Sequence, residues 1–321
     1  MLPSNIRPHR SRRILFIGDI YDKYYSYHYY KFFTRMGHQL MTVCPTGNIP
    51  VNGVFSFRKT ILPLLQVNGF VPDLVIAAES PPCYWANYQE LRKWLHAPMV
   101  FLSFDTALRH REHAIFGNDF DMVFISQQDY LDYFYKNCGA KTYWLQYGCD
   151  PEVHQPLKNQ AEIYDLAFAG SAWCYPRAYQ RRIDYLTALQ KVFSLKIGEG
   201  FWGHQAAELY AQSRMIFNLG LLNGVNPRIY EALSYGKLLL TNRTQSLQGV
   251  FADHVHLVFY DNLNHLAALI RHFLRQPDKR LKIAQQGHYK AWLKHTFYHR
   301  VDQVLRRVFQ EQIYAPIPEN G

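Results

Sequence analysis

The feature that most constrains the fold is a series of short apolar segments that alternate with longer amphipathic ones. Residues 14–18 form the first apolar segment, which ends in a glycine, and a tyrosine-rich stretch at 24–36 with helical spacing follows it. Short apolar strands separated by helices of about ten or more residues favour a parallel, doubly wound sheet. In the first half of the chain we expect further strands at 39–44, 74–78, 99–104 and 122–126 and a helix at 128–137.

The same pattern restarts near residue 165, where the segment DLAFAGS (165–171) repeats the form of the first strand and its glycine turn. Residues 147–162 contain a glycine and two prolines and lack a clear period, so they are the expected linker. In the second half we expect strands at 193–197, 215–219 and 238–241 and helices at 180–191, 206–213, 228–235, 263–275, 278–295 and 298–312. The whole pattern predicts an α/β protein with two Rossmann-like domains that face each other across a cleft.

The expected domain organisation follows from the position of this restart. We assign residues 1–155 to an N-terminal domain, which opens with a basic tail at 1–12. Residues 156–296 form the expected C-terminal domain, and residues 297–321 form a final helix and tail.

The segment with the most chemical information is FNLGLLNGVNPRIYEALSYGKLLLTN, residues 217–242. Asn226 is a good N-cap residue and Pro227 suits the first helical position, so a helix should begin there. Gly236 is placed to end this helix after about two and a half turns. The glycines at 220 and 224 bring the backbone up to the helix N-terminus, where free N–H groups and the helix dipole favour an anion.

Two charged side chains on this helix complete a candidate nucleotide site. Arg228 lies in the first turn, and Glu231 lies three residues later on the same face. A guanidinium at this position can bind a diphosphate, and a carboxylate one turn further can accept hydrogen bonds from a ribose diol. The alternative is a simple surface ion pair between Arg228 and Glu231.

Taken in order, these motifs resemble those of the GT-B glycosyltransferases, and within them the group similar to the spore-maturation protein CgeB. The resemblance extends over residues 14–305 and is strongest in the second half. Its core is N-x-R-x-x-E-A-x-x-x-G at 226–236, and the segment FAGSAWCYPRAYQRRIDYL at 168–186 is similar to the opening of that group's second domain. The linker pattern YGCDPEVHQP at 147–156 also matches.

The resemblance implies transfer of a sugar from a nucleoside diphosphate sugar held by the C-terminal domain. Arg228 would neutralise the leaving diphosphate and Glu231 would hold the ribose, with Asn226 and Gly224 beside them. It further implies a tight loop at Gly170 and Ser171 and a second phosphate contact from Arg177 or Arg182. No metal and no cofactor would be needed, and the last helix would return to the N-terminal domain.

One position departs from the pattern of many retaining enzymes of this fold. They carry a second glutamate eight residues before the one that binds ribose, and here that residue is Asn223. Asparagine can hydrogen-bond a sugar but carries no charge, so retention or inversion stays open. An inverting enzyme needs a general base from the first domain.

The candidate bases lie where strands of the first domain end at the expected cleft. Asp19 and Glu79 each follow a predicted strand. Asp105 follows another and precedes an expected loop that contains Arg109, His110 and His113. We favour Asp105 as the base, although an aspartate at this position often only caps a helix. His28 in the first helix is the alternative base.

Net charge and its distribution limit the possible partners. The chain has 35 basic and 25 acidic side chains, a net charge of +10. Residues 1–13 carry four arginines and no acid, and residues 271–311 carry ten basic side chains against three acidic ones, so the remaining body is nearly neutral. A neutral body argues against a nucleic-acid partner. The basic ends fit an anionic acceptor, a peripheral anionic membrane surface or plain solubility.

The remaining sequence signals exclude several other classes of protein. The five cysteines are scattered without a C-x-x-C pair, which favours neither disulfides nor zinc and predicts a cytoplasmic protein. No apolar segment approaches the ~18–20 residues that cross a bilayer. The first turn lacks G-x-G-x-x-G, so a nicotinamide or flavin enzyme is unsupported.

Two alternatives to a transferase stay open: a nucleotide-sugar epimerase or hydrolase, and a non-catalytic protein of the same shape. The acceptor expected for a transferase is a glycan, a lipid-linked sugar, a protein or a small molecule.

Overall fold

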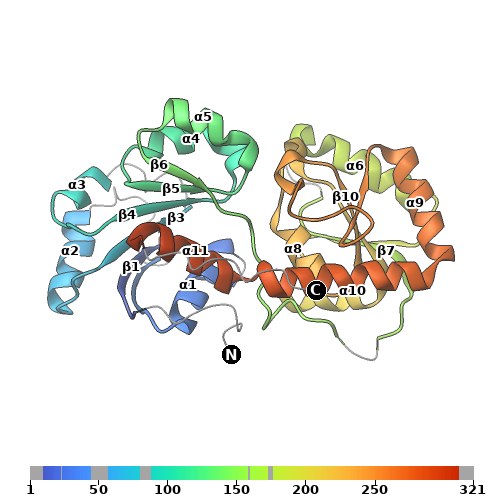
Figure 1. The fold of residues 1–321 in the computed structure, drawn as a ribbon, viewed down its shortest axis with the longest axis horizontal. Coiled ribbons are helices and arrows are strands. Elements are labelled where there is room, and N and C mark those ends of the chain that lie inside the picture. Colours follow the sequence, from blue (N-terminus) through green and yellow to red (C-terminus); the bar gives the residue numbers. More distant parts are fainter. Residues whose placement is uncertain are drawn as a thin grey trace.

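The computed structural model describes residues 10–22, 24–44, 57–79, 88–157, 160–172 and 176–310. These residues form two α/β halves that lie side by side, each built on one parallel sheet (Figure 1). The predicted architecture of two Rossmann-like, doubly wound halves is confirmed.

The first half contains a six-stranded parallel sheet with the order β2-β1-β3-β4-β5-β6. Its strands are β1 (Arg13–Ile17), β2 (Gln39–Val43), β3 (Leu74–Ala78), β4 (Met99–Ser103), β5 (Met122–Ile125) and β6 (Lys141–Trp144). The central strands β3 and β4 are buried along their whole length, which explains their nearly continuous apolar sequence.

Helices cover both faces of this sheet, because alternate strand residues point to opposite sides. Ile14 and Phe16 of β1 pack in one core cluster with α1 and α11, whereas Leu15 and Ile17 pack in another with α2 to α5. The helices of this half are α1 (Tyr25–Arg35), α2 (Phe57–Val67), α3 (Tyr88–Arg92), α4 (Thr106–Gly117) and α5 (Leu131–Asn137), with a 3-10 turn, η2 (Gln128–Tyr130), before α5.

The second half contains a five-stranded parallel sheet with the order β11-β10-β9-β7-β8. Its strands are β7 (Tyr164–Ala169), β8 (Leu195–Gly198), β9 (Ser213–Asn218), β10 (Leu238–Asn242) and β11 (Val258–Tyr260). Its helices are α6 (Pro176–Gln190), α7 (Gly203–Ala211), α8 (Pro227–Ser234), α9 (Leu263–Arg275) and α10 (Pro277–Lys294), with 3-10 turns η3 (Leu221–Asn223) and η4 (Gln245–Leu247). α7 and α8 pack on one face of the sheet and α6 and α9 on the other.

The chain crosses between the halves twice, and the two crossings are bonded to each other. Residues 145–157 lead into the second half, and α11 (Phe297–Phe309) returns to the first, where it packs against α1 (Figure 1). At the crossing, Cys149 exchanges backbone hydrogen bonds of 2.9 and 3.0 Å with His295 and Phe297. The buried Arg300 also donates to the carbonyl of Tyr147 at 2.8 Å. These contacts fix the base of the cleft.

The segment after Asp105 differs from the expected loop. Residues 106–117 form α4, and only Arg109 within it departs from helical angles, with φ −127° and ψ 17°. The helix forms because Ala107, Ala114 and Phe116 bury one face against the first half.

Candidate active site

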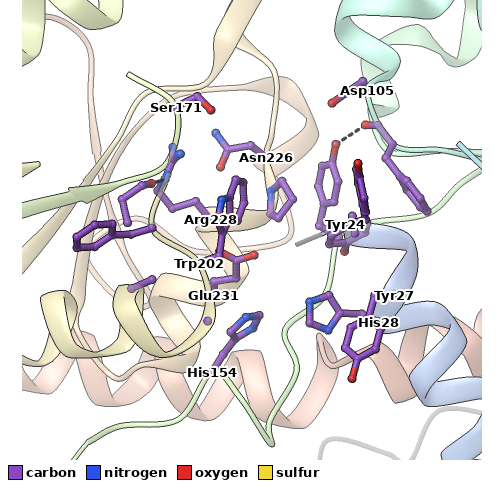
Figure 2. Close-up of a pocket in the computed structure, with 18 of the residues that line it drawn as sticks. Tyr24, Tyr27, His28, Asp105, His154, Ser171, Trp202, Asn226, Arg228 and Glu231 are labelled. Atoms are coloured by element: carbon purple, nitrogen blue, oxygen red, sulfur yellow. Dashed lines mark hydrogen bonds between the residues drawn. The ribbon is translucent and has the colours of Figure 1, made fainter. Parts of the chain in front are cut away.

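A cavity of about 850 Å³ lies between the two halves, and both contribute to its lining (Figure 2). In the first half, the carboxyl ends of β3 and β4 face the cavity. In the second half, the carboxyl end of β7 and the N-terminus of α8 face it. This is where open parallel sheets place their ligands.

Arg228 points from the first turn of α8 toward the end of β7 (Figure 2). Its Nε donates to the carbonyl of Ala169, and its Nη1 donates to Asn218 Oδ1 at 2.9 Å. The guanidinium also lies 4.3 Å from the centre of the Phe168 ring, within cation–π range. These contacts fix the direction of the positive charge before any ligand arrives.

The ion pair considered as the alternative for Arg228 is not formed. Among the residues that the structure describes, no ion pair joins Arg228 to Glu231. Instead, the Glu231 carboxylate lines the cavity and makes no hydrogen bond to a described side chain or backbone group. Burial raises the pKa of Glu231, and the nearby side chains of His28 and Arg228 oppose that increase.

The Gly170–Ser171 loop lies next to the Arg228 guanidinium and is held in place by Arg182. Arg182 is buried, and it donates to the carbonyl of Ser171 at 2.7 Å and to the carbonyl of Leu219 at 2.6 Å. Burial, together with the charge of Arg228, lowers the pKa of Arg182 to about 10. Arg182 therefore differs from the expected phosphate ligand: its guanidinium is used to hold two loops.

Gly170 leaves the space that Arg228 occupies. It has a φ of +124°, and a Cβ at this position would overlap Arg228 Nη2. We expect Gly170→Ala to displace the guanidinium and to weaken nucleoside diphosphate binding at least tenfold, measured by calorimetric titration.

The matched control is Gly249→Ala, which also substitutes a glycine of positive φ (+75°) but meets no atom within 4 Å. It should cost about 1 kcal/mol of stability from backbone strain and leave nucleotide affinity unchanged. Equal losses of affinity in both variants would show that Gly170 matters only for the backbone.

Helix α8 begins as predicted, with Asn226 as N-cap and Pro227 in the first turn. The Asn226 side chain does not cap the helix: its Nδ2 donates to Asn218 Oδ1 at 3.0 Å, and its Oδ1 is buried without a hydrogen-bond partner in the described structure. Figure 2 shows Asn226 directed into the cavity beside Ser171. Helix N-terminal N–H groups and a side-chain amide therefore border the cavity here.

Two of the expected donor-site residues, Asn223 and Gly224, do not line the cavity. Asn223 is exposed, has a φ of 58° and accepts a hydrogen bond from Arg181 at 3.0 Å. Gly224 packs against α4, where a Cβ would lie 3.1 Å from the Cβ of Ala107. The side chain of Arg177 lies outside the described part of the structure. Asn223 lies outside the cavity because its left-handed backbone conformation directs the side chain to the surface.

Gln127 ties this glycine-rich loop to the first half of the molecule. Its Oε1 accepts from the N–H of Val225 at 2.8 Å, and its Nε2 donates to the carbonyl of Val225 at 2.7 Å. A second contact lies nearby, where Ser246 donates to Asp129 at 2.6 Å. The loop that leads into α8 is thus positioned by both halves.

Asp105, at the end of β4, faces the wall that carries Asn226 and Arg228 (Figure 2). It is the N-cap residue of α4, yet its side chain makes no capping hydrogen bond. Its carboxylate, open to the cavity, has no hydrogen bond to a described residue. The alternative that this aspartate only caps a helix is therefore not what the structure shows.

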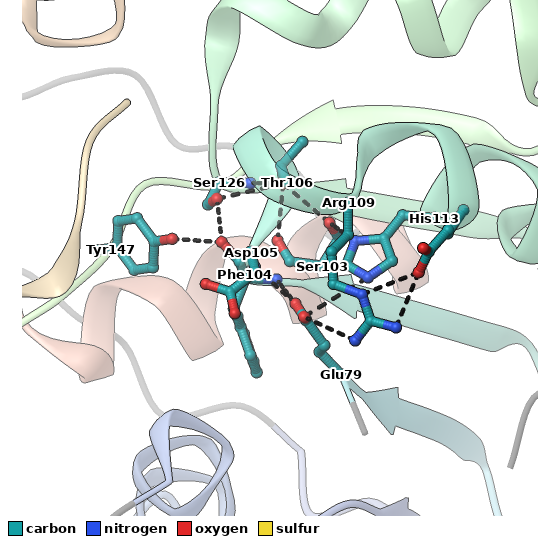
Figure 3. Close-up of polar contacts among 10 residues, drawn as sticks. Glu79, Ser103, Phe104, Asp105, Thr106, Arg109, His113, Ser126 and Tyr147 are labelled. Atoms are coloured by element: carbon teal, nitrogen blue, oxygen red, sulfur yellow. Dashed lines mark hydrogen bonds and ion pairs between the residues drawn. The ribbon is translucent and has the colours of Figure 1, made fainter. Parts of the chain in front are cut away.

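Glu79 at the end of β3 supports the turn that presents Asp105 (Figure 3). Its Oε2 accepts the N–H groups of Phe104 and Asp105, each at 2.6 Å, and its Oε1 lies 3.9 Å from Arg109 Nη1. Burial, followed by the negative charge of Asp105, raises the pKa of Glu79 to about 8. Burial also raises the pKa of Asp105, against the charge of Arg109. Both carboxyl groups therefore hold their protons more tightly than they would in water.

The other candidate bases lie elsewhere. Asp19 is buried, does not line the cavity and accepts a contact from the Cys44 thiol at 3.7 Å. His28 does line the cavity, with its Nδ1 3.1 Å from Asp150 Oδ2 and its ring 5.6 Å from that of His154. Figure 2 shows it at the same end of the cavity as Glu231 and His154, whereas Asp105 is at the end with Ser171 and Asn226. His28 therefore lies at the Glu231 end of the cavity, away from Asp105.

Several lining residues had no recognisable signal in the sequence. Trp202 precedes α7, is half exposed and borders the cavity, and His154 comes from the linker. Gln127 lines the cavity and Asn218 is buried behind it, and both act through hydrogen bonds to groups that are distant in the sequence. The tyrosine-rich stretch that begins at residue 24 contributes Tyr24, Tyr25 and Tyr27 to the lining.

Two further observations concern metals and membranes. Within the described ranges, no group of three His, Cys, Asp or Glu side chains could hold a metal ion. Among the helices in those ranges, none combines the length and the apolar character that a membrane span requires.

Two parallel α/β halves that face a cleft, with a last helix returning to the first half, make up the GT-B fold of glycosyltransferases. Residues 151–306, just under half of the chain, match the family described as glycosyl transferase-like. Comparison with curated proteins gives no match.

Solved structures with the same fold cover nearly all of this chain. Sucrose-phosphate synthase from Thermosynechococcus elongatus superposes with a TM-score of 0.65 and 11% identity, covering 93% of this chain and 99% of its own. HepE of Anabaena, in complex with UDP and glucose, gives a TM-score of 0.63 and 13% identity and covers 94% of this chain and 100% of its own. At these identities the likeness shows the fold.

Proposed function

We propose that this protein transfers a sugar from a nucleoside diphosphate sugar to a hydroxyl group of an acceptor. The observation that carries the proposal is the fixed Arg228 guanidinium at the N-terminus of α8, in a cavity where Glu231 offers an unpaired carboxylate. The matched family and the complexes of HepE with UDP and with UDP-glucose support a nucleotide-sugar donor. The N-x-R-x-x-E pattern at 226–231 supports the CgeB-like group within this class.

In this proposal the donor lies along the wall formed by the second half. Arg228, the Gly170–Ser171 loop and the N-terminus of α8 bind the diphosphate, and Glu231 binds the ribose hydroxyls. Trp202 is placed to pack on the base. The sugar then lies toward Asn226 and Asp105.

The chemical step needs charge stabilisation on the donor side and a proton acceptor on the other. As the acceptor oxygen forms a bond to the anomeric carbon, the bond from that carbon to the diphosphate oxygen breaks and its electron pair leaves with the diphosphate. Arg228 and the helix N–H groups stabilise this charge, so we propose that activity needs no metal. The acceptor proton passes to the Asp105 carboxylate. Asn223 stands where many retaining enzymes carry a second glutamate, and here it lies on the surface, which favours this inverting route.

A ribose contact at Glu231 can be tested with the donor nucleotide alone. We expect the wild type to bind a ribonucleoside diphosphate about tenfold more tightly than its 2′-deoxy counterpart, which corresponds to about one hydrogen bond to a charged group. In Glu231→Ala this preference should disappear while binding of the deoxynucleotide changes little. Calorimetric titration of UDP, GDP or ADP, whichever binds, and of its 2′-deoxy form measures both.

Glu208→Ala is the control for this comparison, because Glu208 lies on the neighbouring helix α7 with an exposed side chain. It should retain the full preference for ribose. A Glu231→Ala protein that still discriminates tenfold would place the ribose elsewhere.

A further inference from the structure

The two walls of the cavity carry different ionisable side chains. The first half contributes the carboxylates of Asp22 and Asp105 together with Glu79, whose pKa burial raises to about 8. None of the described lysines or arginines of this half lines the cavity. The arginines that line it, Arg182 and Arg228, belong to the donor wall.

The same wall is rich in aromatic side chains. Tyr24, Tyr25 and Tyr27 of the first helix and its approach line the cavity together with Phe104. Tyr25 is packed against Phe104 and Tyr147, with ring centres 4.9 and 5.1 Å apart, so it forms part of the floor. Tyrosine rings offer flat apolar surfaces with a polar edge, and carboxylates accept hydrogen bonds from hydroxyl groups.

The basic C-terminal helices do not contribute to this wall. No described residue of α9, α10 or α11 lines the cavity. In those helices Arg280 and Arg300 are buried, and Arg306 pairs with Asp302 at 2.8 Å. The expectation that the basic C-terminus marks an anionic acceptor therefore has no support at the site itself.

We propose that the acceptor is an uncharged polyol, namely a sugar residue of a neutral glycan or glycoside, and that acceptors with a phosphate or carboxylate at this position are rejected. This inference rests on the proposed function and names the acceptor class for the same site. The carboxylates of this wall repel an anionic acceptor, because two negative charges a few ångströms apart repel each other strongly in a partly enclosed cleft. Hydroxyl groups and the C–H faces of a sugar ring meet complementary partners there instead.

The test uses two probes that differ by one carboxylate. The enzyme, saturated with the nucleoside diphosphate that it binds, is titrated with 4-nitrophenyl β-glucoside and with 4-nitrophenyl β-glucuronide, and the α-anomers are tested in the same way. Binding is followed by saturation-transfer NMR, and transfer from the donor sugar is followed by chromatography. We expect the glucoside to bind at least tenfold more tightly and to be the better acceptor.

Variants assign the preference to this wall. Asp22→Lys should reduce the preference for the glucoside severalfold, because it replaces an exposed negative charge at the rim with a positive one. Tyr27→Ala should weaken glucoside binding, and Tyr135→Ala, at an exposed position on α5, should not. Asp132→Lys, at an exposed position on α5 that does not line the cavity, makes the same change of charge and should leave the preference unchanged.

The outcomes separate this inference from the proposed function. Equal or tighter binding of the glucuronide, or no binding of either glycoside to the nucleotide-loaded enzyme, overturns the acceptor class. Loss of nucleotide binding itself would overturn the proposed function instead, and it is measured in the same samples before the glycoside is added.

Discussion

Replacing Arg228 with alanine is expected to lower affinity for the nucleoside diphosphate about 100-fold and the rate of transfer by a further factor of about 10²–10³. The first effect corresponds to about 2.7 kcal/mol, as for hydrogen bonds to charged groups. The second is typical of removing a fixed group that stabilises developing negative charge. Calorimetric titration of the nucleotide and single-turnover transfer rates measure the two effects separately.

The effect of this substitution on folding should be smaller than its effect on binding. Arg228→Ala leaves the Ala169 carbonyl and one bond of Asn218 Oδ1 without their donor, which costs about 1–3 kcal/mol. Arg243→Ala is the control, since Arg243 lies on the surface of the same half and pairs with Asp253 and Asp261. An Arg228→Ala protein that keeps wild-type nucleotide affinity would contradict the donor site.

Replacing Asp105 with asparagine is expected to lower kcat about 10²–10⁴-fold, the usual contribution of a general base. Nucleotide affinity should stay within about twofold, because Asp105 belongs to the opposite wall. Asparagine keeps the size of the side chain and removes the proton acceptor. Steady-state kinetics with a neutral glycoside acceptor and titration of the nucleotide measure the two quantities.

The pH dependence gives an independent check on this role. A base must be ionised, so activity should be lost as the pH falls through the pKa of Asp105, which burial raises above the ordinary value of about 3.9. The acidic limb of the kcat/KM profile should therefore lie above pH 4 and be absent from whatever activity Asp105→Asn retains.

Two neighbouring variants separate Asp105 from its surroundings. Glu79→Gln mimics the protonated carboxyl and can still accept the N–H groups of Phe104 and Asp105, so it should keep activity within about tenfold. His28→Gln should change nucleotide affinity more than kcat, because His28 lies near Glu231. If His28→Gln abolishes kcat while Asp105→Asn retains it, the base is His28.

The sequence predicted the layered fold because each strand carries its own signal. The segments at 14–18 and 165–171 are apolar runs with a glycine at or near their end, and both become interior strands of their sheets. The start of α8 was also predictable, since Asn226 and Pro227 are local signals for a helix N-terminus. By contrast, β6, with its mixed sequence KTYW, has no clear apolar pattern.

The finer arrangement of the site depends on contacts that no local pattern encodes. Arg182 and Arg228 look alike in the sequence and both line the cavity, but Arg182 is buried and its guanidinium donates to two loop carbonyls. Asn223 was placed near the sugar by its spacing, whereas a left-handed turn directs it to Arg181. Likewise His113 follows Asp105 closely in the sequence but is fully buried, 2.7 Å from Ser103 Oγ (Figure 3).

The central claim, that the cavity binds a nucleoside diphosphate sugar, is tested most directly by a thermal-shift panel of UDP-, GDP-, dTDP-, ADP- and CMP-sugars on the wild type and Arg228→Ala. At 100 times its dissociation constant a ligand stabilises the folded protein by about 2.7 kcal/mol, enough to raise Tm by several degrees. We predict that sugars of one nucleoside diphosphate raise the Tm of the wild type and that Arg228→Ala loses this shift. No shift with any member of the panel, or the same shift in both proteins, would contradict the claim.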